Sequence, residues 1–443
     1  MRTSTSIKTA VMIALAIAAS GCSVLKRKTP KTPVLGERIA VLTSEGNVTV
    51  DPALAEIPMS FPAAVANTSW AQSGGNAAKS VGHVALGNAL GQAWQVSIGR
   101  GSSLTMRLTA APVVADGKVF TIDTIGEVRA FDAQTGSLVW RIQTPYDKGG
   151  GNAMYGGGVA YDSGYVFATN GNGYTVALNA TNGGQRWKVR PGGPLRGAPS
   201  VANGAVYVMS QDNQIFSLDQ ATGKTNWSQS AALEIAGVFG AASPAVAQGT
   251  VVAGFSSGEL NAYRYENGRQ VWQDALQRTS ITTSVSSISD IDADPVIDGG
   301  QVYAIGQGGR MVALDLNTGQ RLWEANISGI STPWVAGDWV FVVTSDAKLI
   351  CFARSTGKVR WINSLPEFVR PKAKRGQIDY SGPILAGDRL ILASSTGALI
   401  NLNPTNGSFQ SQTNVGASIS LPPVVANSTL YLLDDKGTLH AFR

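Results

Sequence analysis

The chain has 443 residues, of which 14% are charged and 51 are glycine, a composition that suits a turn-rich β protein. Its formal net charge of +6 has a local origin, because residues 1–31 hold six of the 35 lysine and arginine residues and no acid. The rest of the chain therefore carries 29 basic and 29 acidic residues, and this balance excludes nucleic-acid binding through a broadly basic face.

The first 21 residues have the features of a signal peptide. Arg2 and Lys8 are followed by an apolar run over residues 9–19, which is too short to span a bilayer as a permanent helix. The run leads into Ala-Ser-Gly-Cys, ending at Cys22, and this motif resembles the lipobox of bacterial lipoproteins. The resemblance implies that Cys22 is acylated. Serine rather than aspartate at position 23 implies an anchor on the periplasmic face of the outer membrane. The alternative is an ordinary secretion signal with a cysteine there by chance.

Three further parts follow the signal peptide. Residues 22–37 are rich in lysine, proline and threonine, and we expect them to form a flexible tether that carries the lipid. We expect residues 38–89 to be an N-terminal extension, whose packing the sequence does not predict. Residues 90–443 are expected to form a single large domain, because one repeat runs through them.

The repeat is anchored on tryptophan. Four residues before each anchor lies a glycine, which follows a threonine or an asparagine, and the residue ten before the anchor is small in most copies. The anchors are Trp140, Trp187, Trp227, Trp272, Trp323 and Trp361, with Ser411 in the same place in a seventh copy. A period of about 45 residues with strand-like content indicates a β-propeller.

Each copy predicts four short strands. Runs such as 119–122 and 128–131 are β-rich, and glycine with aspartate or asparagine separates them. We expect the glycine before the anchor to take a positive φ, and the small residue to leave room for the tryptophan between neighbouring sheets. One repeated turn position is acidic or amidic, and we interpret its members as turn caps in different blades rather than as an acid cluster. They are Asp132, Asn179, Asp219 and Asp315.

The ends of the chain predict how the ring closes. After the seventh copy only three strand-like runs remain, the last of them ending at Arg443. The missing fourth run has a candidate in residues 92–96, because Trp94 lies one period before Trp140. Pairing the two ends would remove exposed sheet edges. The sequence therefore predicts an all-β fold: an eight-bladed β-propeller of four-stranded blades, closed by an N-terminal strand that completes the last blade.

Two insertions break the period. Residues 275–292 end in the run Asp290-Ile291-Asp292, and residues 366–379 carry four cations. Loops that are longer than a repeat requires often carry function. For the basic insertion a solvated surface is the alternative interpretation, and the sequence does not predict its role. Its cations are Arg370, Lys372, Lys374 and Arg375.

The chain has no motif for catalysis or metal binding. Cys22 and Cys351 are the only cysteines, and Cys351 occupies the small-residue position of its repeat, so we interpret it as a buried packing residue. His83 and His440 have no neighbouring motif that would make them catalytic. No Cys-x-x-Cys, nucleophile elbow or His/Glu metal spacing occurs. We therefore predict no enzyme activity, no cofactor and no metal site.

The pattern Ala-x-Asp-x-x-Thr-Gly-x-x-x-Trp resembles the repeat of the pyrroloquinoline-quinone-type propeller family. Quinoprotein dehydrogenases of this family use the ring to hold a cofactor and Ca²⁺, and many carry a vicinal cysteine pair, which Cys351 alone cannot supply. BamB-type lipoproteins of the outer-membrane β-barrel assembly machinery use it as an interaction ring without a cofactor. The lipobox, the chain length and the eight repeats resemble the BamB type over nearly the whole mature chain.

The BamB resemblance implies a non-enzymatic scaffold that docks on the periplasmic domains of BamA, next to other lipoproteins of the machinery. Such a scaffold assists the folding and insertion of outer-membrane proteins, which in unfolded form are a further candidate partner. Two other functions stay open: a generic ligand- or peptide-binding propeller and, with less support, a quinoprotein dehydrogenase. The sequence predicts neither the client proteins nor the affinity for any partner.

The same resemblance implies two docking loops. One holds Asp290 and Asp292, whose carboxylates would point the same way on an extended chain and pair with basic groups of the partner. The alternative is that these two residues cap a turn. The other loop holds Val238, Phe239 and Gly240. The family often has an arginine where this chain has Phe239, so an apolar contact is expected to replace an ionic one.

Overall fold

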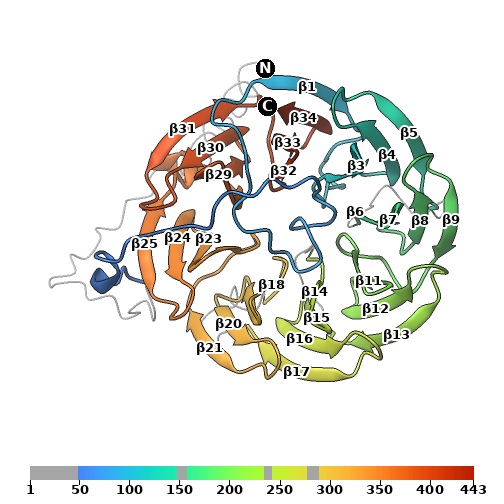
Figure 1. The fold of residues 1–443 in the computed structure, drawn as a ribbon, viewed down its shortest axis with the longest axis horizontal. Helices are drawn as coiled ribbons and strands as arrows, with labels where there is room; N and C mark the ends of the chain where they lie inside the picture. Colours follow the sequence, from blue (N-terminus) through green and yellow to red (C-terminus); the bar gives the residue numbers. More distant parts are fainter. Residues whose placement is uncertain (1–47, 147–156, 234–241, 277–288) are drawn as a thin grey trace, which may run out of the picture. The chain divides into compact units, whose positions relative to one another are not determined.

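The computed structural model describes residues 48–146, 157–233, 242–276 and 289–443. They belong to one compact unit, Gly46–Arg443. Eight four-stranded antiparallel sheets stand around a central axis as the blades of a propeller (Figure 1). The signal peptide, the tether with Cys22, and the loop with Val238, Phe239 and Gly240 lie outside the described residues.

Each blade runs from an inner strand beside the axis to an outer strand at the rim (Figure 1). Blades one to four consist of β2 (Val113–Ala115), β3 (Lys118–Ile122), β4 (Glu127–Asp132) and β5 (Leu138–Gln143); β6 (Val159–Asp162), β7 (Tyr165–Thr169), β8 (Thr175–Asn179) and β9 (Gln185–Val189); β10 (Ser200–Ala202), β11 (Ala205–Met209), β12 (Gln214–Asp219) and β13 (Thr225–Ser230); and β14 (Ala245–Ala247), β15 (Thr250–Gly254), β16 (Glu259–Arg264) and β17 (Gln270–Ala275).

Blades five to eight complete the ring. They consist of β18 (Val296–Asp298), β19 (Gln301–Ile305), β20 (Met311–Asp315) and β21 (Arg321–Ala325); β22 (Trp334–Ala336), β23 (Trp339–Val343), β24 (Lys348–Ala353) and β25 (Val359–Ser364); β28 (Tyr380–Ala386), β29 (Arg389–Ser394), β30 (Ala398–Leu402) and β31 (Phe409–Asn414); and β32 (Val424–Ala426), β33 (Thr429–Leu433), β34 (Thr438–Phe442) and β1 (Gln92–Ser97). A two-stranded hairpin, β26 (Phe368–Arg370) and β27 (Arg375–Gln377), lies between blades six and seven.

Regular helix is confined to short 3-10 turns in the described ranges, η2 (Pro52–Leu54) and η4 (Pro371–Ala373). None of these described helices is long and apolar enough to cross a membrane. The eight-bladed, all-β architecture predicted from the repeat is therefore confirmed.

The tryptophan anchors join neighbouring blades. In blade three Trp227 lies opposite Ser217, the small residue that was predicted to leave room for it. Its indole N–H donates to the Tyr265 carbonyl of blade four at 2.8 Å, and Gly268 of that blade lies against its ring. A Cβ on Gly268 would be 2.6 Å from Trp227 Cδ2, and its φ of +70° also favours glycine. The indole N–H groups of the other anchors likewise donate to a backbone carbonyl of the next blade. These anchors are Trp94, Trp140, Trp187, Trp272, Trp323 and Trp361.

The predicted closure by the N-terminal strand is also confirmed. β1 pairs antiparallel with β34, and Trp94 lies opposite Ala441. This pairing explains the exceptional Ser411 of blade seven. The next blade is built from both chain ends, so its third and fourth strands are not joined by a Thr-Gly turn that could receive a tryptophan. β31, which carries Ser411, is exposed along its whole length.

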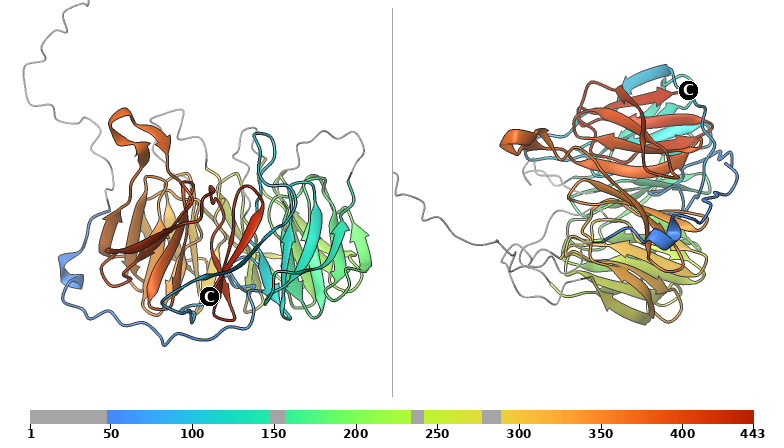
Figure 2. Two further views of the ribbon diagram at one scale, coloured as in Figure 1. Left: turned by 90° about the horizontal axis from the view of Figure 1, so that it is seen from above. Right: turned by 90° about the vertical axis from the view of Figure 1, so that its left-hand side faces the viewer.

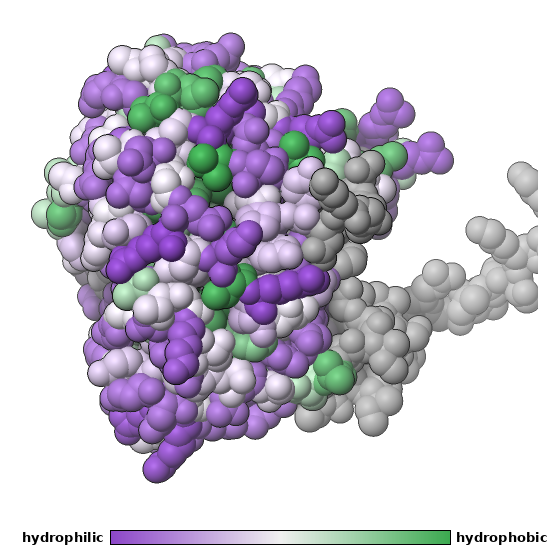
Figure 3. Space-filling view, turned by 90° about the vertical axis from the view of Figure 1, so that its right-hand side faces the viewer, coloured by the Kyte–Doolittle hydropathy of each residue, from purple (hydrophilic) through white to green (hydrophobic). Residues whose placement is uncertain are grey.

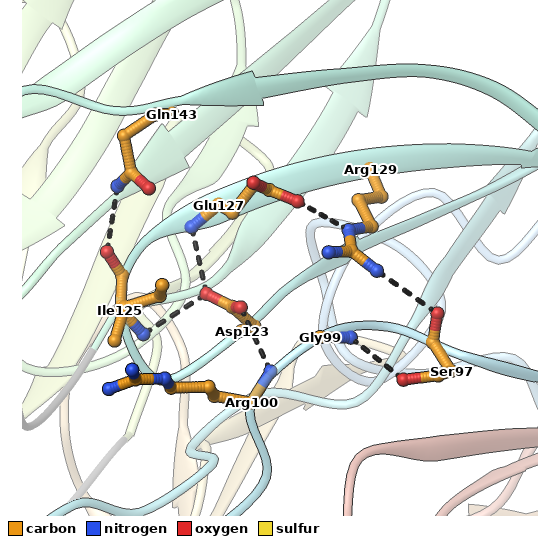
Figure 4. Close-up of polar contacts among 8 residues, drawn as sticks. All are labelled: Ser97, Gly99, Arg100, Asp123, Ile125, Glu127, Arg129 and Gln143. Atoms are coloured by element: carbon orange, nitrogen blue, oxygen red, sulfur yellow. Dashed lines mark hydrogen bonds and ion pairs between the residues drawn. The ribbon is translucent and has the colours of Figure 1, made fainter.

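Polar contacts fix the seam between the closing strand and blade one (Figure 4). Asp123 Oδ1 accepts from the backbone N–H groups of Ile125 and Glu127, and its Oδ2 accepts from Arg100 N at 3.0 Å. Arg129 donates to the carbonyl of Ser97 at the end of β1. Burial raises the pKa of Asp123, and its three backbone hydrogen bonds oppose that rise. The carboxylate thus holds its own turn and ties it to the segment that follows β1.

The ring has two different faces. We call the side with the turns between first and second and between third and fourth strands the turn face, and the side with the remaining turns and the links between blades the connection face. In blade three Asp219 Oδ1 accepts from the backbone N–H groups of Ala221 and Thr222 and from the Thr222 hydroxyl. Asp132, Asn179 and Asp315 cap the equivalent turns. The interpretation of these residues as turn caps is confirmed.

The outer surface differs from the blade interiors. Inner and middle strands are almost wholly buried, as in the pattern of β11 and β15. Outer strands bury little besides the tryptophan, as in β13. Figure 3 shows one side of the ring, on which hydrophilic residues predominate and hydrophobic residues form small, separate patches. The apolar surface is thus used mainly between blades.

Candidate functional site

The described part of the N-terminal extension crosses the turn-face end of the central axis (Figures 1 and 2). Trp70 exchanges two backbone hydrogen bonds with Val114 of blade one, at 2.7 and 2.9 Å. The Gln72 side chain does the same with Val201 of blade three. Further backbone bonds join this segment to the inner strands of blades two, four, five and seven, through Tyr161, Val246, Ile297 and Leu385. The extension thereby satisfies inner sheet edges that would otherwise stay open.

Lys79 fixes the middle of this segment. Its side chain is buried, and Nζ donates to Ser200 Oγ of blade three at 2.8 Å. Burial lowers the pKa of Lys79 to about 8, and the nearby Asp294 carboxylate opposes that shift. Asp294 itself accepts from the Ser73 hydroxyl at 2.5 Å and from Ser243 N at 2.7 Å. A buried cation and a buried carboxylate thus attach the extension to blades three, four and five.

Asp290 and Asp292 lie inside the ring rather than on its surface. Asp290 is fully buried, and the Asp292 side chain is 8% exposed. Asp292 Oδ1 lies 3.6 Å from Arg196 Nη2, which comes from the link before blade three, and Asp292 Oδ2 accepts from Gln307 at 2.7 Å. Burial raises the pKa of Asp292, and the Arg196 charge opposes that rise; burial also lowers the pKa of Arg196.

This burial corrects one premise of the docking prediction. Two exposed carboxylates were expected to point toward a partner, but a desolvated acid needs a partner inside the protein, and Arg196 supplies one for Asp292. The partner-binding role of both residues stays a prediction, as does that of the loop around Phe239. Sequence reasoning missed Arg196 and Lys79, because the residues that they contact lie in other blades.

A cavity of about 550 Å³ lies between the extension and the links that enter the inner strands. One part of its wall is the stacked pair Trp70 and Trp334, whose ring centroids are 6.2 Å apart at an interplanar angle of 12°. Lys79, Asp292 and Asp294 contribute polar groups to the lining. The cavity therefore combines an aromatic wall with groups that already serve internal contacts.

The lining does not fit a quinone cofactor with its calcium ion. Asp292 and Asp294 are the buried carboxylates at the cavity, and each already accepts hydrogen bonds from neighbouring residues. Within the described ranges no group of three or more His, Cys, Asp and Glu side chains could hold a metal. Cys351 is buried opposite Trp361, and burial raises its pKa, so it packs as predicted.

The two histidines have structural contacts. His440 Nε2 lies 3.1 Å from Asp434 Oδ2, and both side chains are buried in blade eight. His83 Nδ1 lies 2.9 Å from the Pro62 carbonyl, and His83 Nε2 accepts from Asp388 N at 3.2 Å. Each imidazole thus fixes either a turn or a point where two segments of the chain cross. These structural roles agree with the absence of a catalytic motif around the two histidines in the sequence.

The connection face carries exposed apolar side chains in several separate links. Leu104 is 96% exposed between blades eight and one, Leu233 is 75% exposed after blade three, and Val369 is 60% exposed on the β26–β27 hairpin. Tyr146 and Ile330, in two further links, are about half exposed. Large apolar side chains at the tips of polar links are typical of interaction surfaces. This face is therefore the candidate partner-binding surface.

Comparison with known proteins reveals the relatives of the chain. The profile of the family described as "Outer membrane protein assembly factor BamB" matches residues 87–155 and 125–363, more than half of the chain. The outer membrane protein assembly factor BamB of Burkholderia pseudomallei is 29% identical over 356 residues, which cover 80% of this chain and 87% of that protein.

Solved structures share the fold. The crystal structure of BamB from Moraxella catarrhalis superposes with a TM-score of 0.68 at 20% identity, over 80% of this chain and all of that one. Quinohemoprotein alcohol dehydrogenase from Comamonas testosteroni gives 0.66 at 14% identity, over 86% of this chain and 81% of that one. At these identities the structures establish the propeller alone, which enzymes and assembly factors share.

Proposed function

Because this chain belongs to the family of outer membrane protein assembly factor BamB, we propose that it is a non-catalytic scaffold in the assembly of outer-membrane proteins. The family match carries this proposal. The relative from Burkholderia pseudomallei, which bears the name of an assembly factor, supports it over most of both chains. The cavity chemistry supports it as well, because the carboxylates there are engaged by neighbouring residues rather than arranged to hold a metal.

The finer parts of the proposal concern location and partners. Acylation of Cys22 anchors the ring to the outer membrane on its periplasmic face. The connection face docks on the periplasmic domains of BamA, next to other lipoproteins of the machinery, and unfolded outer-membrane proteins are a further partner. Exposed Leu233 borders the segment with Val238, Phe239 and Gly240, which supports an apolar contact there. Asp290 and Asp292, which are buried, then support the docking indirectly. Asp292, for example, fixes the link before blade three through Arg196.

Co-purification in mild detergent tests the docking. We expect Phe239→Asp to remove most BamA from the purified lipoprotein while the melting temperature stays unchanged, because a charge in an apolar contact is costly to desolvate. The matched control is Phe409→Asp, which places the same charge at an exposed position of an outer strand and should leave BamA bound. Equal retention of BamA by both variants would place the docking surface elsewhere.

Peptide binding in the cavity is the second candidate function, and its stacked tryptophan wall is the observation that favours it. A scaffold that acts through its connection face has no need of this cavity. Isothermal titration of the purified protein with unstructured peptides separates the two functions. Binding that Trp334→Ala abolishes, in a protein that still retains BamA, would assign a separate ligand site to the cavity.

A further inference from the structure

Two projections stand on the connection face beyond the regular links. One is the basic hairpin, residues 366–379, which Figure 2 shows in orange as it projects from the ring on the side opposite the N-terminal extension. The other is the Leu104 loop, residues 99–108, between the closing strand and blade one. The docking contact proposed above is centred on a different link of this face, the one that holds Leu233 and Phe239.

The basic hairpin is held firmly at its base. Its two strands pair with Phe368 opposite Gln377 and Arg370 opposite Arg375. Tyr380, which is buried in blade seven, donates its hydroxyl to the Pro366 carbonyl at 2.8 Å, and Ile378 N donates to Glu367 O at 2.9 Å. The tip is therefore a defined projection, and it presents the exposed cations Arg370, Lys372, Lys374 and Arg375 together with exposed Val369.

The Leu104 loop is ordered from within. Ser103 N donates to the Met106 carbonyl at 2.6 Å, and Leu108 N donates to Ser102 Oγ at 3.0 Å. Met106 and Leu108 point inward and are buried, whereas Leu104 is almost fully exposed. Two exposed arginines flank it, Arg100 and Arg107. An apolar side chain among cations thus recurs on the second projection.

We propose that these two projections bind anionic phospholipid headgroups and hold the connection-face side of the ring against the membrane surface. In the described part of the chain, the four hairpin cations make no ion pair with an acid, so their charge is available to an outside partner. A lipid surface is a diffuse array of phosphates that long, independent side chains can follow. Exposed Leu104 and Val369 fit the apolar boundary beneath the headgroups.

The position of the N-terminal extension is compatible with this contact, which rests on the proposed lipid anchor. Asp51 N donates to the Val359 carbonyl at the start of β25, and the same strand leads at its other end into the basic hairpin. The 26 residues from Cys22 to residue 47 can span at most about 90 Å. The anchor and the hairpin can thus reach one bilayer from the same sector of the ring.

A single fluorescent label on the intact lipoprotein tests the contact. Cys351 is buried and Cys22 is expected to carry the lipid, so Ala373→Cys would give one reactive thiol at the tip of the basic hairpin. We expect an environment-sensitive dye there to report burial in vesicles of phosphatidylcholine with phosphatidylglycerol, but not in pure phosphatidylcholine. Raising the salt from about 0.05 M to about 0.5 M should reduce the signal at least about two-fold. Ala221→Cys, an exposed position on the turn face, is the matched label and should stay silent.

Two charge variants identify the groups responsible. Changing the four hairpin cations to glutamine should lower the signal on anionic vesicles to the level of neutral vesicles. The control removes the same charge from the outer rim and should keep the signal. It is the combination Arg141→Gln, Lys188→Gln, Lys224→Gln and Arg269→Gln, all at exposed positions. In the same way, Leu104→Ser with Val369→Ser should weaken the signal, whereas Leu138→Ser with Leu322→Ser should not.

Three results would overturn the proposal: a label at residue 373 that is silent on anionic vesicles, an equal loss in the rim control, or a response that needs added outer-membrane protein. The last would assign the projections to a protein partner. Failure of the proposed anchor is seen separately, because protein without a lipid on Cys22 would not sediment with neutral vesicles at all.

Discussion

The turn face and the connection face are made by the same strands, yet they differ in almost every respect. On the turn face, each Thr-Gly or Asn-Gly turn repeats one hydrogen-bonded geometry and receives the tryptophan of the preceding blade. The N-terminal extension then covers the centre of this face. On the connection face the links vary in length, expose Leu104 and Leu233, and include the basic hairpin.

The two faces therefore serve different purposes: the turn face stabilises the ring, and the connection face is available for recognition. The repeated turns must match the blade next to them, so their sequence is constrained by packing. The exposed tips of the links do not pack against a neighbouring blade, which makes them suitable for partners. Variants at the turns that receive a tryptophan should therefore cost the most stability, and those on exposed parts of the connection face should leave the protein folded.

The largest effect is expected at the glycine of a turn. A Cβ on Gly223, whose φ is +75°, would lie 2.7 Å from Trp187 Cε3. We expect Gly223→Ala to lower the free energy of unfolding by about 3–4 kcal/mol, because strain at positive φ adds to overpacking. Urea unfolding measures this change in the free energy of unfolding. Gly204→Ala isolates the strain, because Gly204 has a φ of +72° and nothing within 4 Å of its Cβ position; it should cost about 1 kcal/mol. Equal costs would mean that the tryptophan contact does not constrain the turn.

The second variant tests a residue of the connection face that is buried. We expect Asp292→Ala to lower the free energy of unfolding by about 3 kcal/mol, since it removes one partner of a buried ion pair with Arg196. Lys348→Met is the control, because the Lys348–Asp346 pair is largely exposed and should contribute less than about 1 kcal/mol. If Asp292→Ala keeps its full stability and loses only BamA, the carboxylate acts at the partner surface, as its sequence position first indicated.

These residues show how far sequence reasoning extends. The period around Trp94 and Trp140 predicted the closed ring, because each anchor acts on its nearest blade and the pattern is local. The caps such as Asp219 were predictable for the same reason. The partners of Asp292 and Lys79 were not, since Arg196 and Ser200 come from another blade and no pattern in the sequence pairs them with these residues. Such contacts near the central axis form only when the ring has folded. The period of the sequence does not predict which residues meet there.

A third, smaller effect depends on pH and concerns the extension that covers the turn face. Burial lowers the pKa of Lys79 from 10.5 to about 8, so between these values the unfolded chain holds a proton that the native protein has released. The free energy of unfolding should therefore rise as the pH increases across this window. Below about pH 8 the native protein keeps the charged Lys79 side chain, and the full cost of burying that charge is present. Between about pH 7.5 and 9.5 we expect the wild type to gain about 1–2 kcal/mol relative to Lys79→Met. Lys188→Met, at an exposed lysine, should show no such difference. Parallel pH profiles for Lys79→Met and the wild type would mean that the amine does not titrate in the native protein.

The smallest effect is expected at the cap of a single turn, where blade two already provides a natural comparison. Asn179 makes the same bonds to two backbone N–H groups that Asp219 makes in blade three, so hydrogen bonding rather than charge defines the position. We expect Asp219→Asn to be almost neutral at pH 7, and Asp219→Ala to lower the free energy of unfolding by less than about 1 kcal/mol. Bonds from Thr222 hold the pKa of Asp219 below its usual value, so its contribution is present above the unfolded pKa and is lost as the pH falls through the folded one. Asp219→Asn should therefore lose slightly less stability in acid than the wild type, which calorimetry at pH 3 and pH 7 can measure. A large loss for Asp219→Asn at pH 7 would show that charge is required, and the turn face would then owe its regularity to electrostatics as well as to geometry.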